Sequence, residues 1–346
     1  MKVATRTLQV KEIIRETPDT KSFVLECPDG NLEYKAGQFL TFLFTMRNGT
    51  EARRSYSISS SPDLNESLTI TVKRIANGEF SRHLIDRTKL GDELLTIGAS
   101  GFFVLPQHIE DYDQLIFMAA GSGITPVYSL IKTVLFAHQS VKILLLYSNT
   151  NLHSAIFYDK LKAMQEKFPE RLTIEFLFSR SPDLFRSRLT PESLEMFLWK
   201  HDISYVANTL YYICGPADYM RMVTFRLISL GVEPGHIKKE IFHVQHPSIR
   251  PAPPDKDVHS VTLIRNDEHY RFSVQYPVTI LQAAKLLDIH IPYSCESGQC
   301  GTCVARCLQG KVWMAHNEVL LDEEIRDGAV LTCTGYPVNG DVMLKI

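Results

Sequence analysis

The sequence lacks the features that mark membrane-spanning, secreted and nucleic-acid-binding proteins. No apolar run reaches the roughly 18 residues typical of a transmembrane helix, and residues 1–10 contain no apolar signal-peptide core. The formal net charge is only −2, which provides no general attraction to nucleic acid or to an anionic membrane. Seven cysteines are present, but four have a spacing typical of a metal cluster, which leaves no disulfide framework. We therefore expect a cytoplasmic protein that binds neither membranes nor nucleic acid.

Length and pattern predict several domains of different kinds. The 346 residues suffice for two or three domains, and 45% hydrophobic with 22% charged residues is ordinary for a globular protein. Short strands separated by turn signals predict an antiparallel β-barrel over residues 1–108. Strands alternating with helices over 109–244 predict an α/β domain with a parallel sheet. Four prolines between 245 and 257 predict an extended spacer, followed by a further domain over 258–346.

Four cysteines in the last domain form the most specific pattern of the chain. Cys295, Cys300 and Cys303 follow a C-x4-C-x2-C spacing, and Cys333 follows after 29 intervening residues. This is the plant-type arrangement in which four thiolates hold a [2Fe–2S] cluster. The alternatives are a zinc site, which favours short paired C-x2-C spacings, and a set of buried free thiols. We interpret the four as cluster ligands, with Cys333 on a strand over 330–334, and Cys307 as a packed bystander.

A strand-like stretch of the β-rich region carries a cation, an aromatic ring and a hydroxyl. Arg54 and Tyr56 share one face of the expected strand, and Ser57 lies beside them. These groups suit the phosphate, the ring and a ring nitrogen of a flavin nucleotide, although many strands contain the same residue types. Farther along, Gly78 and Ser81 open a short amphipathic helix, where Ser81 can act as the N-cap or help to hold a phosphate.

Two glycine turns follow strands of the expected parallel sheet. Gly121 and Gly123 lie at the first strand-to-helix turn, where glycine lets the backbone approach a pyrophosphate. The sequence there is G-S-G-I-T-P rather than the dinucleotide-binding G-x-G-x-x-G, and no acidic residue follows at the expected distance. A tight turn without a ligand is therefore the alternative. Cys214, Gly215 and Pro216 form the second turn, in which the thiol faces either a reaction centre or the core.

Taken together, these stretches resemble the ferredoxin–NADP reductase superfamily. The motifs R-S-Y-S, G-E-F-S, G-S-G-I-T-P and C-G-P occur in that order between residues 54 and 216. The C-terminal domain resembles a plant-type ferredoxin, which implies an α+β fold of the β-grasp type. The order of reductase first and ferredoxin last is similar to that of reductase components of multicomponent oxygenases, including the phenylacetyl-CoA epoxidase and ketosteroid hydroxylase types.

The resemblance implies roles for individual residues. Tyr56 would lie against the flavin ring, with Ser57 near its N5 atom. Catalytic roles fall on Tyr56, Ser57, Thr125 and Cys214. Cofactor binding would involve Arg54, Tyr56, Ser57, Gly78, Phe80, Ser81, Gly121, Gly123, Thr125, Pro126, Gly215, Pro216 and Phe242. The metal ligands would be Cys295, Cys300, Cys303 and Cys333. For Phe242, a core position at a strand end is the alternative.

The expected activity is that of an oxidoreductase that moves electrons from NAD(P)H through a flavin and a [2Fe–2S] cluster to a partner protein. A nicotinamide gives two electrons together, a cluster carries one, and a flavin can do both. The resemblance favours FAD over FMN. Arg180 with Ser179 suits the 2′-phosphate of NADPH, but a solvated strand end fits as well, so NADPH and NADH are both kept. The partner is expected to be an oxygenase or another metalloenzyme component. The alternative is a redox-sensing or electron-carrier module without its own NAD(P)H turnover.

Overall fold

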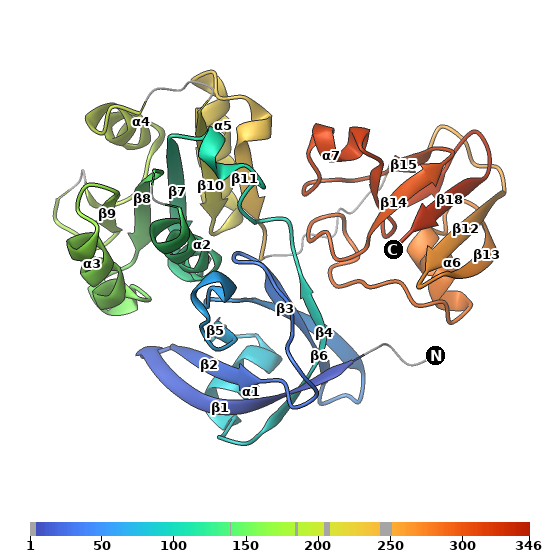
Figure 1. Cartoon of the computed structure of the whole chain (residues 1–346), viewed down its shortest axis with the longest axis horizontal. Coiled ribbons are helices and arrows are strands. Elements are labelled where there is room, and N and C mark those ends of the chain that lie inside the picture. The colour runs from blue at the N-terminus through green and yellow to red at the C-terminus, as the bar shows by residue number, and fades with distance from the viewer. Residues whose placement is uncertain (1–4, 139, 184–185, 204–207, 243–250) are drawn as a thin grey trace. The chain divides into compact units, whose positions relative to one another are not determined.

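The computed structural model describes residues 5–138, 140–183, 186–203, 208–242 and 251–346 (Figure 1). The chain divides into two compact units. The first spans 6–99 and 103–242, and the second contains residues 5 and 100–102 with everything described from 251 onward. Of the predicted spacer over 245–257, residues 245–250 lie outside the described residues. The remainder of the spacer belongs to the second unit, where Asp255 accepts a 2.7 Å hydrogen bond from the backbone N–H of Asn339.

The first unit begins with an antiparallel sheet whose strand order is β4-β3-β6-β1-β2-β5. A bridge between Ile58 and Ile70 closes the sheet on itself, which gives the predicted barrel form. Inward-facing apolar side chains such as Leu8, Phe23 and Phe42 fill it. The strands are β1 (Arg6–Thr17), β2 (Thr20–Glu26), β3 (Phe39–Thr45), β4 (Glu51–Ser57), β5 (Thr69–Lys73) and β6 (Glu93–Ser100), and helix α1 (Glu79–Arg87) lies between β5 and β6 in the chain.

A parallel five-stranded sheet of order β11-β10-β7-β8-β9 completes the first unit. Strand β7 is apolar from its second residue onward because both of its faces are covered: Leu115 and Phe117 pack with α2 and α3, and Ile116 and Met118 pack with α4 and α5. Figure 1 shows these helix pairs on the two sides of the sheet. The strands are β7 (Gln114–Ala120), β8 (Lys142–Asn149), β9 (Leu172–Phe178), β10 (Thr209–Cys214) and β11 (Ile237–Glu240), and the helices are α2 (Ile124–Ala137), α3 (Tyr158–Lys167), α4 (Pro191–Lys200) and α5 (Ala217–Ser229).

The second unit is built on a mixed sheet of order β13-β12-β18-β14-β16, with a separate β15-β17 pair. Strands β12 and β13 form an antiparallel hairpin, and helix α6 buries Ile280, Leu281 and Ala284 in the core. The elements are β12 (His259–Arg265), β13 (Glu268–Val274), α6 (Ile280–Leu286), β14 (Val304–Gln309), β15 (Val312–Met314), α7 (Asp322–Arg326), β16 (Ala329–Leu331), β17 (Gly335–Pro337) and β18 (Val342–Lys345). The predicted strand over 330–334 is too long, because β16 ends at Leu331 and Cys333 lies in the following turn.

Candidate functional site

Two glycine turns meet at the carboxyl ends of the neighbouring strands β7 and β10. Within the sheet, β7 lies between β8 and β10. The chain runs from β7 to β8 and on to β9 at one edge, and it then returns to β10 on the opposite flank of β7, so the strand order reverses at β7. Open parallel sheets bind nucleotides in the crevice at such a point. A Cβ atom added to Gly123 would lie 2.1 Å from the carbonyl oxygen of Cys214. The two turns therefore contact each other directly, although they are far apart in the sequence.

The nucleotide turn contains a buried polar atom without a partner. Thr125 is buried at the start of α2, and its Oγ1 makes no hydrogen bond among the described residues. Gly121 adopts φ +56° and faces open space, so the backbone there is accessible. A buried hydroxyl without a partner is costly unless a ligand satisfies it. The turn thus fits a bound nucleotide, with Pro126 buried in the first turn of α2 behind it.

Strand β4 presents the predicted flavin-binding residues at different depths. Arg54 is exposed, Tyr56 is half-buried and Ser57 is buried. The Tyr56 ring lies among aromatic side chains, with its centroid 5.8 Å from that of Phe80 and 6.2 Å from that of Phe42. Burial raises the pKa of the Tyr56 hydroxyl, which stays protonated at neutral pH. The Ser57 Oγ has no partner among the described residues, as expected of a group that a cofactor would satisfy.

The structure alters the interpretation of the helix that follows. Gly78, not Ser81, is the N-cap of α1. The Ser81 Oγ lies one turn inside the helix, where it accepts from the Ile75 N–H at 3.2 Å and donates to the Gly78 carbonyl at 3.1 Å. Phe80 is buried against Phe44, with ring centroids 4.5 Å apart. The side chains of Phe80 and Ser81 are therefore used within the protein, and a phosphate here would bind the free N–H groups of the helix end.

A buried acid that sequence reasoning missed lies beside the second turn. Glu240 is the last residue of β11 and is paired in register with Cys214. Burial raises the pKa of Glu240 to about 8, and burial also raises the pKa of the Cys214 thiol, so both are protonated near neutral pH. Phe242 follows two residues later and is exposed, which contradicts a core position. The sequence shows an acidic residue two positions before Phe242, which could have marked Glu240 as a candidate. Only the pairing of β11 with β10 places Glu240 next to Cys214.

The four predicted cluster ligands lie in two pairs in the second unit. A hydrogen bond from Cys300 lowers the pKa of Cys295, and one from Cys333 lowers the pKa of Cys303, so each pair is in contact. Among the described residues, no three His, Cys, Asp or Glu side chains converge as they would on a single metal ion. Two pairs of thiols fit a two-iron cluster, in which each iron takes two thiolates.

Glycine and backbone N–H groups shape the cysteine loop. Gly298 and Gly301 adopt φ +78° and +73°, and a Cβ on Gly298 would lie 2.5 Å from the His316 carbonyl oxygen. The Ser297 N–H donates to the Cys295 Sγ at 3.4 Å, as in a loop whose backbone N–H groups stabilise cluster sulfurs. Cys307 lies outside this loop on β14, where its thiol donates to the Gln309 carbonyl at 3.4 Å.

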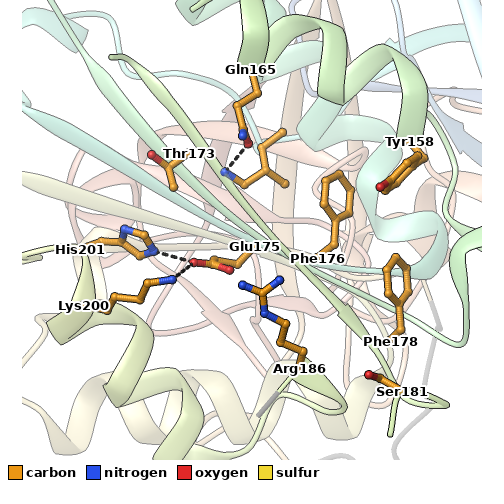
Figure 2. A pocket seen from close by; sticks show the side chains of 11 residues that line it. Tyr158, Gln165, Thr173, Glu175, Phe176, Phe178, Ser181, Arg186, Lys200 and His201 are labelled. Atoms are coloured by element: carbon orange, nitrogen blue, oxygen red, sulfur yellow. Dashed lines mark hydrogen bonds and ion pairs between the residues drawn. The ribbon is translucent and has the colours of Figure 1, made fainter. Parts of the chain in front are cut away.

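A pocket of about 500 Å³ lies along the edge strand β9 (Figure 2). Its lining includes the rings of Phe176 and Phe178 and the side chains of Glu175 and Arg186. Burial raises the pKa of Glu175, but hydrogen bonds from Lys200 and His201 outweigh burial and keep it below its usual value. The Glu175 carboxylate is therefore ionised, and its charge is balanced by its contacts with Lys200 and His201.

The segment between β9 and α4 carries three exposed arginines, Arg180, Arg186 and Arg188. Arg180 is the second residue after the strand, and its guanidinium makes no ion pair with any described residue. Arg186 and Arg188 also make no ion pair with any described residue. The end of β9 therefore carries positive charge without a counter-ion in the described part of the chain.

Three domain families match the chain. They are the oxidoreductase FAD-binding domain at residues 7–104, the oxidoreductase NAD-binding domain at 117–224 and the 2Fe–2S iron–sulfur cluster binding domain at 263–338. The chain is 32% identical over 349 residues to the ferredoxin reductase component of 3-ketosteroid-9-alpha-monooxygenase from Rhodococcus rhodochrous, over 98% of this chain and 96% of that protein. The chain belongs to this family of reductase components. The resemblance inferred from the motifs is thereby confirmed, as is the oxidoreductase class.

Other relatives agree over the full length. A component of the 1,2-phenylacetyl-CoA epoxidase of Escherichia coli (strain K12) is 31% identical over 350 residues, covering 98% of this chain and 96% of that protein. The structure of phthalate dioxygenase reductase matches with a TM-score of 0.60 and 23% identity, over 99% of this chain and 98% of that one. That match confirms the predicted fold class. The reductase thus combines FAD-binding, NAD-binding and 2Fe–2S domains. In the part of the chain that the structure describes, no helix is long and apolar enough to cross a membrane.

Proposed function

We propose that this reductase takes electrons from NADPH and delivers them to the oxygenase component of a multicomponent system. The observation that carries the proposal is the meeting of the two glycine turns at the point where the strand order reverses, in the same unit as the flavin-binding strand β4. A bound flavin accepts a hydride and releases single electrons, and a [2Fe–2S] cluster carries one electron at a time. The four cysteines can bind iron only as reduced thiolates, and the cytoplasm keeps thiols reduced, so the proposed function includes a cytoplasmic location.

The protein's own groups position the two nucleotides and exclude water. The buried hydroxyls of Ser57 and Thr125 have no partner among the described residues and are available to the flavin and to the pyridine nucleotide, respectively. Tyr56 offers a flat, partly buried ring for the flavin to pack on. Cys214 remains a neutral thiol because burial raises its pKa, so it acts through packing beside the nicotinamide rather than as a nucleophile.

The choice of NADPH over NADH rests on the end of β9. NADPH differs from NADH by a 2′-phosphate, and a guanidinium binds phosphate through paired charge-assisted hydrogen bonds. Arg180 is exposed beside Ser179 at this strand end, and no described residue neutralises it. No acidic residue occupies either position to repel a phosphate.

Anaerobic titration of the purified protein with each nucleotide tests the function. NADPH is expected to bleach the flavin and iron–sulfur absorption bands, and NADH to do so at higher concentration. Arg180→Gln should raise the KM for NADPH by roughly 10- to 100-fold, the loss expected of a charged hydrogen bond of about 1.5–3 kcal/mol, and leave the KM for NADH unchanged. Lys162→Gln, an exposed charge on α3, is the control. If neither nucleotide bleaches the flavin, the reductase function is wrong. If NADH is preferred, only the nucleotide assignment is wrong.

A further inference from the structure

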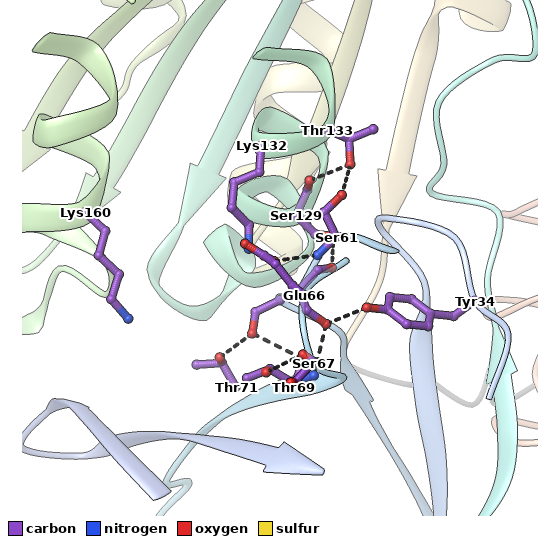
Figure 3. Close-up of polar contacts among 12 residues, drawn as sticks. Tyr34, Ser61, Glu66, Ser67, Thr69, Thr71, Ser129, Lys132, Thr133 and Lys160 are labelled. Atoms are coloured by element: carbon purple, nitrogen blue, oxygen red, sulfur yellow. Dashed lines mark hydrogen bonds and ion pairs between the residues drawn. The ribbon is translucent and has the colours of Figure 1, made fainter. Parts of the chain in front are cut away.

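Helix α2 is joined to the segment after β4 by three polar contacts, which we call the polar seam (Figure 3). The Ser129 hydroxyl donates to the Ser60 carbonyl oxygen at 2.5 Å. The hydroxyls of Thr133 and Ser61 lie 2.7 Å apart. The third contact is an ion pair between Lys132 and Glu66. The seam thus connects the nucleotide-binding part of the first unit to its flavin-binding part.

The ion pair of the seam is buried on its lysine side. The Lys132 side chain is only 9% exposed, against 34% for Glu66. The same carboxylate also accepts a 2.8 Å hydrogen bond from the Ser61 N–H. Burial lowers the pKa of Lys132, and the contact with Glu66 opposes that effect. A buried lysine stays charged only if its acidic partner is held close to it. The Lys132–Glu66 pair therefore fixes α2 against the segment between β4 and β5.

The seam links the helix that carries Thr125 to the segment that follows Ser57, and the hydroxyls of these two residues have no partner among the described residues. Thr125, Ser129 and Thr133 are spaced four residues apart, so they share one face of α2. Thr125 begins that face at the nucleotide turn, and the seam residues continue it. On the other side, Ser60 follows Ser57 of the flavin strand after only two residues. A shift of α2 against the loop would therefore change the separation of the nucleotide turn and the flavin strand.

We propose that the polar seam is a positioning device that sets the distance between the nicotinamide and the flavin. The inference rests on the proposed function, because it assumes that both nucleotides bind in the first unit. Lys132 and Glu66 are positioning residues, since they act through α2 and the loop rather than on the reacting atoms. A displacement of about 1 Å far from the reacting atoms can slow a reaction roughly 100-fold.

A second lysine–glutamate pair provides a matched control. Lys160 on α3 contacts Glu16 on β1 at 2.8 Å, so it also joins the two parts of the first unit. The Lys160 side chain is 45% exposed, whereas the Glu16 side chain is 6% exposed and also accepts a 2.8 Å hydrogen bond from the Ser22 hydroxyl. Lys160 is on α3, whereas the nucleotide turn leads into α2. The charge of Lys160 contributes to the lowered pKa of Lys132, but Lys160 makes none of the three seam contacts. Lys160→Met therefore removes one lysine of such a pair and leaves the seam contacts in place.

The test compares Lys132→Met, Glu66→Gln, the double variant and Lys160→Met as full-length proteins loaded with flavin. Stopped-flow mixing with NADPH yields the limiting rate of flavin reduction and the Kd separately. Lys132→Met and Glu66→Gln should each lower the limiting rate about 10-fold, with the Kd and flavin content unchanged, and the double variant should lose no more than either single one. Lys160→Met should stay within about 2-fold of the wild type, because Lys160 makes no seam contact and Glu16 keeps its hydrogen bond from Ser22.

Two further measurements separate positioning from general damage. The long-wavelength absorbance of nicotinamide stacked on flavin should weaken in Lys132→Met. Amide hydrogen exchange over residues 121–127, measured without NADPH, should speed up in the same variant and not in Lys160→Met. Ser61→Ala with Thr133→Val removes the hydroxyl pair without leaving a charge behind. If Lys132→Met fails to fold, the Ser61→Ala, Thr133→Val double variant is the test instead, and its limiting rate of flavin reduction is expected to fall about 3-fold.

The outcomes are distinct. Wild-type limiting rates in every seam variant, or an equal loss in Lys160→Met, would overturn the positioning role while leaving the proposed function intact. A change in Kd alone would also overturn it. If wild-type flavin is reduced by neither NADPH nor NADH, the proposed function itself fails.

Discussion

Ser57 buries a hydroxyl that has no hydrogen-bond partner among the described residues. In the protein without flavin, such a hydroxyl lowers the free energy of unfolding, because it has lost its hydrogen bonds to water and has no protein partner in their place. Ser57→Ala should therefore stabilise the flavin-free protein by up to about 1 kcal/mol and weaken flavin binding by roughly 5- to 10-fold. Thermal unfolding with and without flavin measures both effects, which are expected to have opposite signs.

Ser59, two residues farther on, is the matched control for this prediction. Its hydroxyl accepts from Thr71 at 2.9 Å and donates to the Thr69 carbonyl oxygen at 3.3 Å, so it is already satisfied. Ser59→Ala should lower the melting temperature of both forms of the protein by a similar amount. If Ser57→Ala behaves in the same way, its hydroxyl has an internal role and is not the flavin contact.

At the scale of elements, the turn between β7 and α2 depends on Gly123. A Cβ there would lie 2.1 Å from the Cys214 carbonyl oxygen, a backbone atom that cannot move aside alone. Gly123→Ala should push the turn away from β10, destabilise the protein by about 1–3 kcal/mol and raise the Kd for NADPH at least 10-fold. Denaturant unfolding and nucleotide titration measure the two effects.

Gly231, after α5, is the control for backbone strain alone. It adopts φ +90°, and a Cβ there would meet nothing within 4 Å. Gly231→Ala should cost about 1–2 kcal/mol through its positive φ and leave the Kd for NADPH unchanged. Equal weakening of NADPH binding by both variants would mean that stability, rather than the contact between the turns, governs binding.

Local pattern was enough to predict most elements, but not the contacts between them. The apolar run of β7 and the start of α4 at Pro191 can be read within a few residues, because burial and helix starts leave local signals. Glu240 was missed since its environment depends on β11 pairing with β10. The polar seam was invisible for the same reason, as Glu66 and Lys132 are 66 residues apart. Of the two alternatives kept for Ser81, the N-cap was wrong, because Gly78 occupies that position.

At the scale of the whole molecule, the two units divide the redox groups between them. The candidate flavin and nucleotide residues belong to the first unit, and all four cluster cysteines belong to the second. Each unit also has hydrophobic cores of its own. Loss of the cluster should therefore leave the chemistry of the first unit intact, since a metal site that couples to folding stabilises only the part that contains it.

Cys333→Ser tests this division. The variant should lose its iron and sulfide, because it lacks one of the four cluster thiolates. Its flavin should still be reduced by NADPH within about 2-fold of the wild-type rate, because Cys333 does not belong to the first unit. Transfer to a one-electron protein acceptor should fall more than 10-fold. Cys307→Ser, which changes a cysteine outside the two thiol pairs, should keep both the iron and the transfer rate. A Cys333→Ser protein that still passes electrons at the wild-type rate would show that the acceptor draws them from the flavin, and the cluster would then need another role.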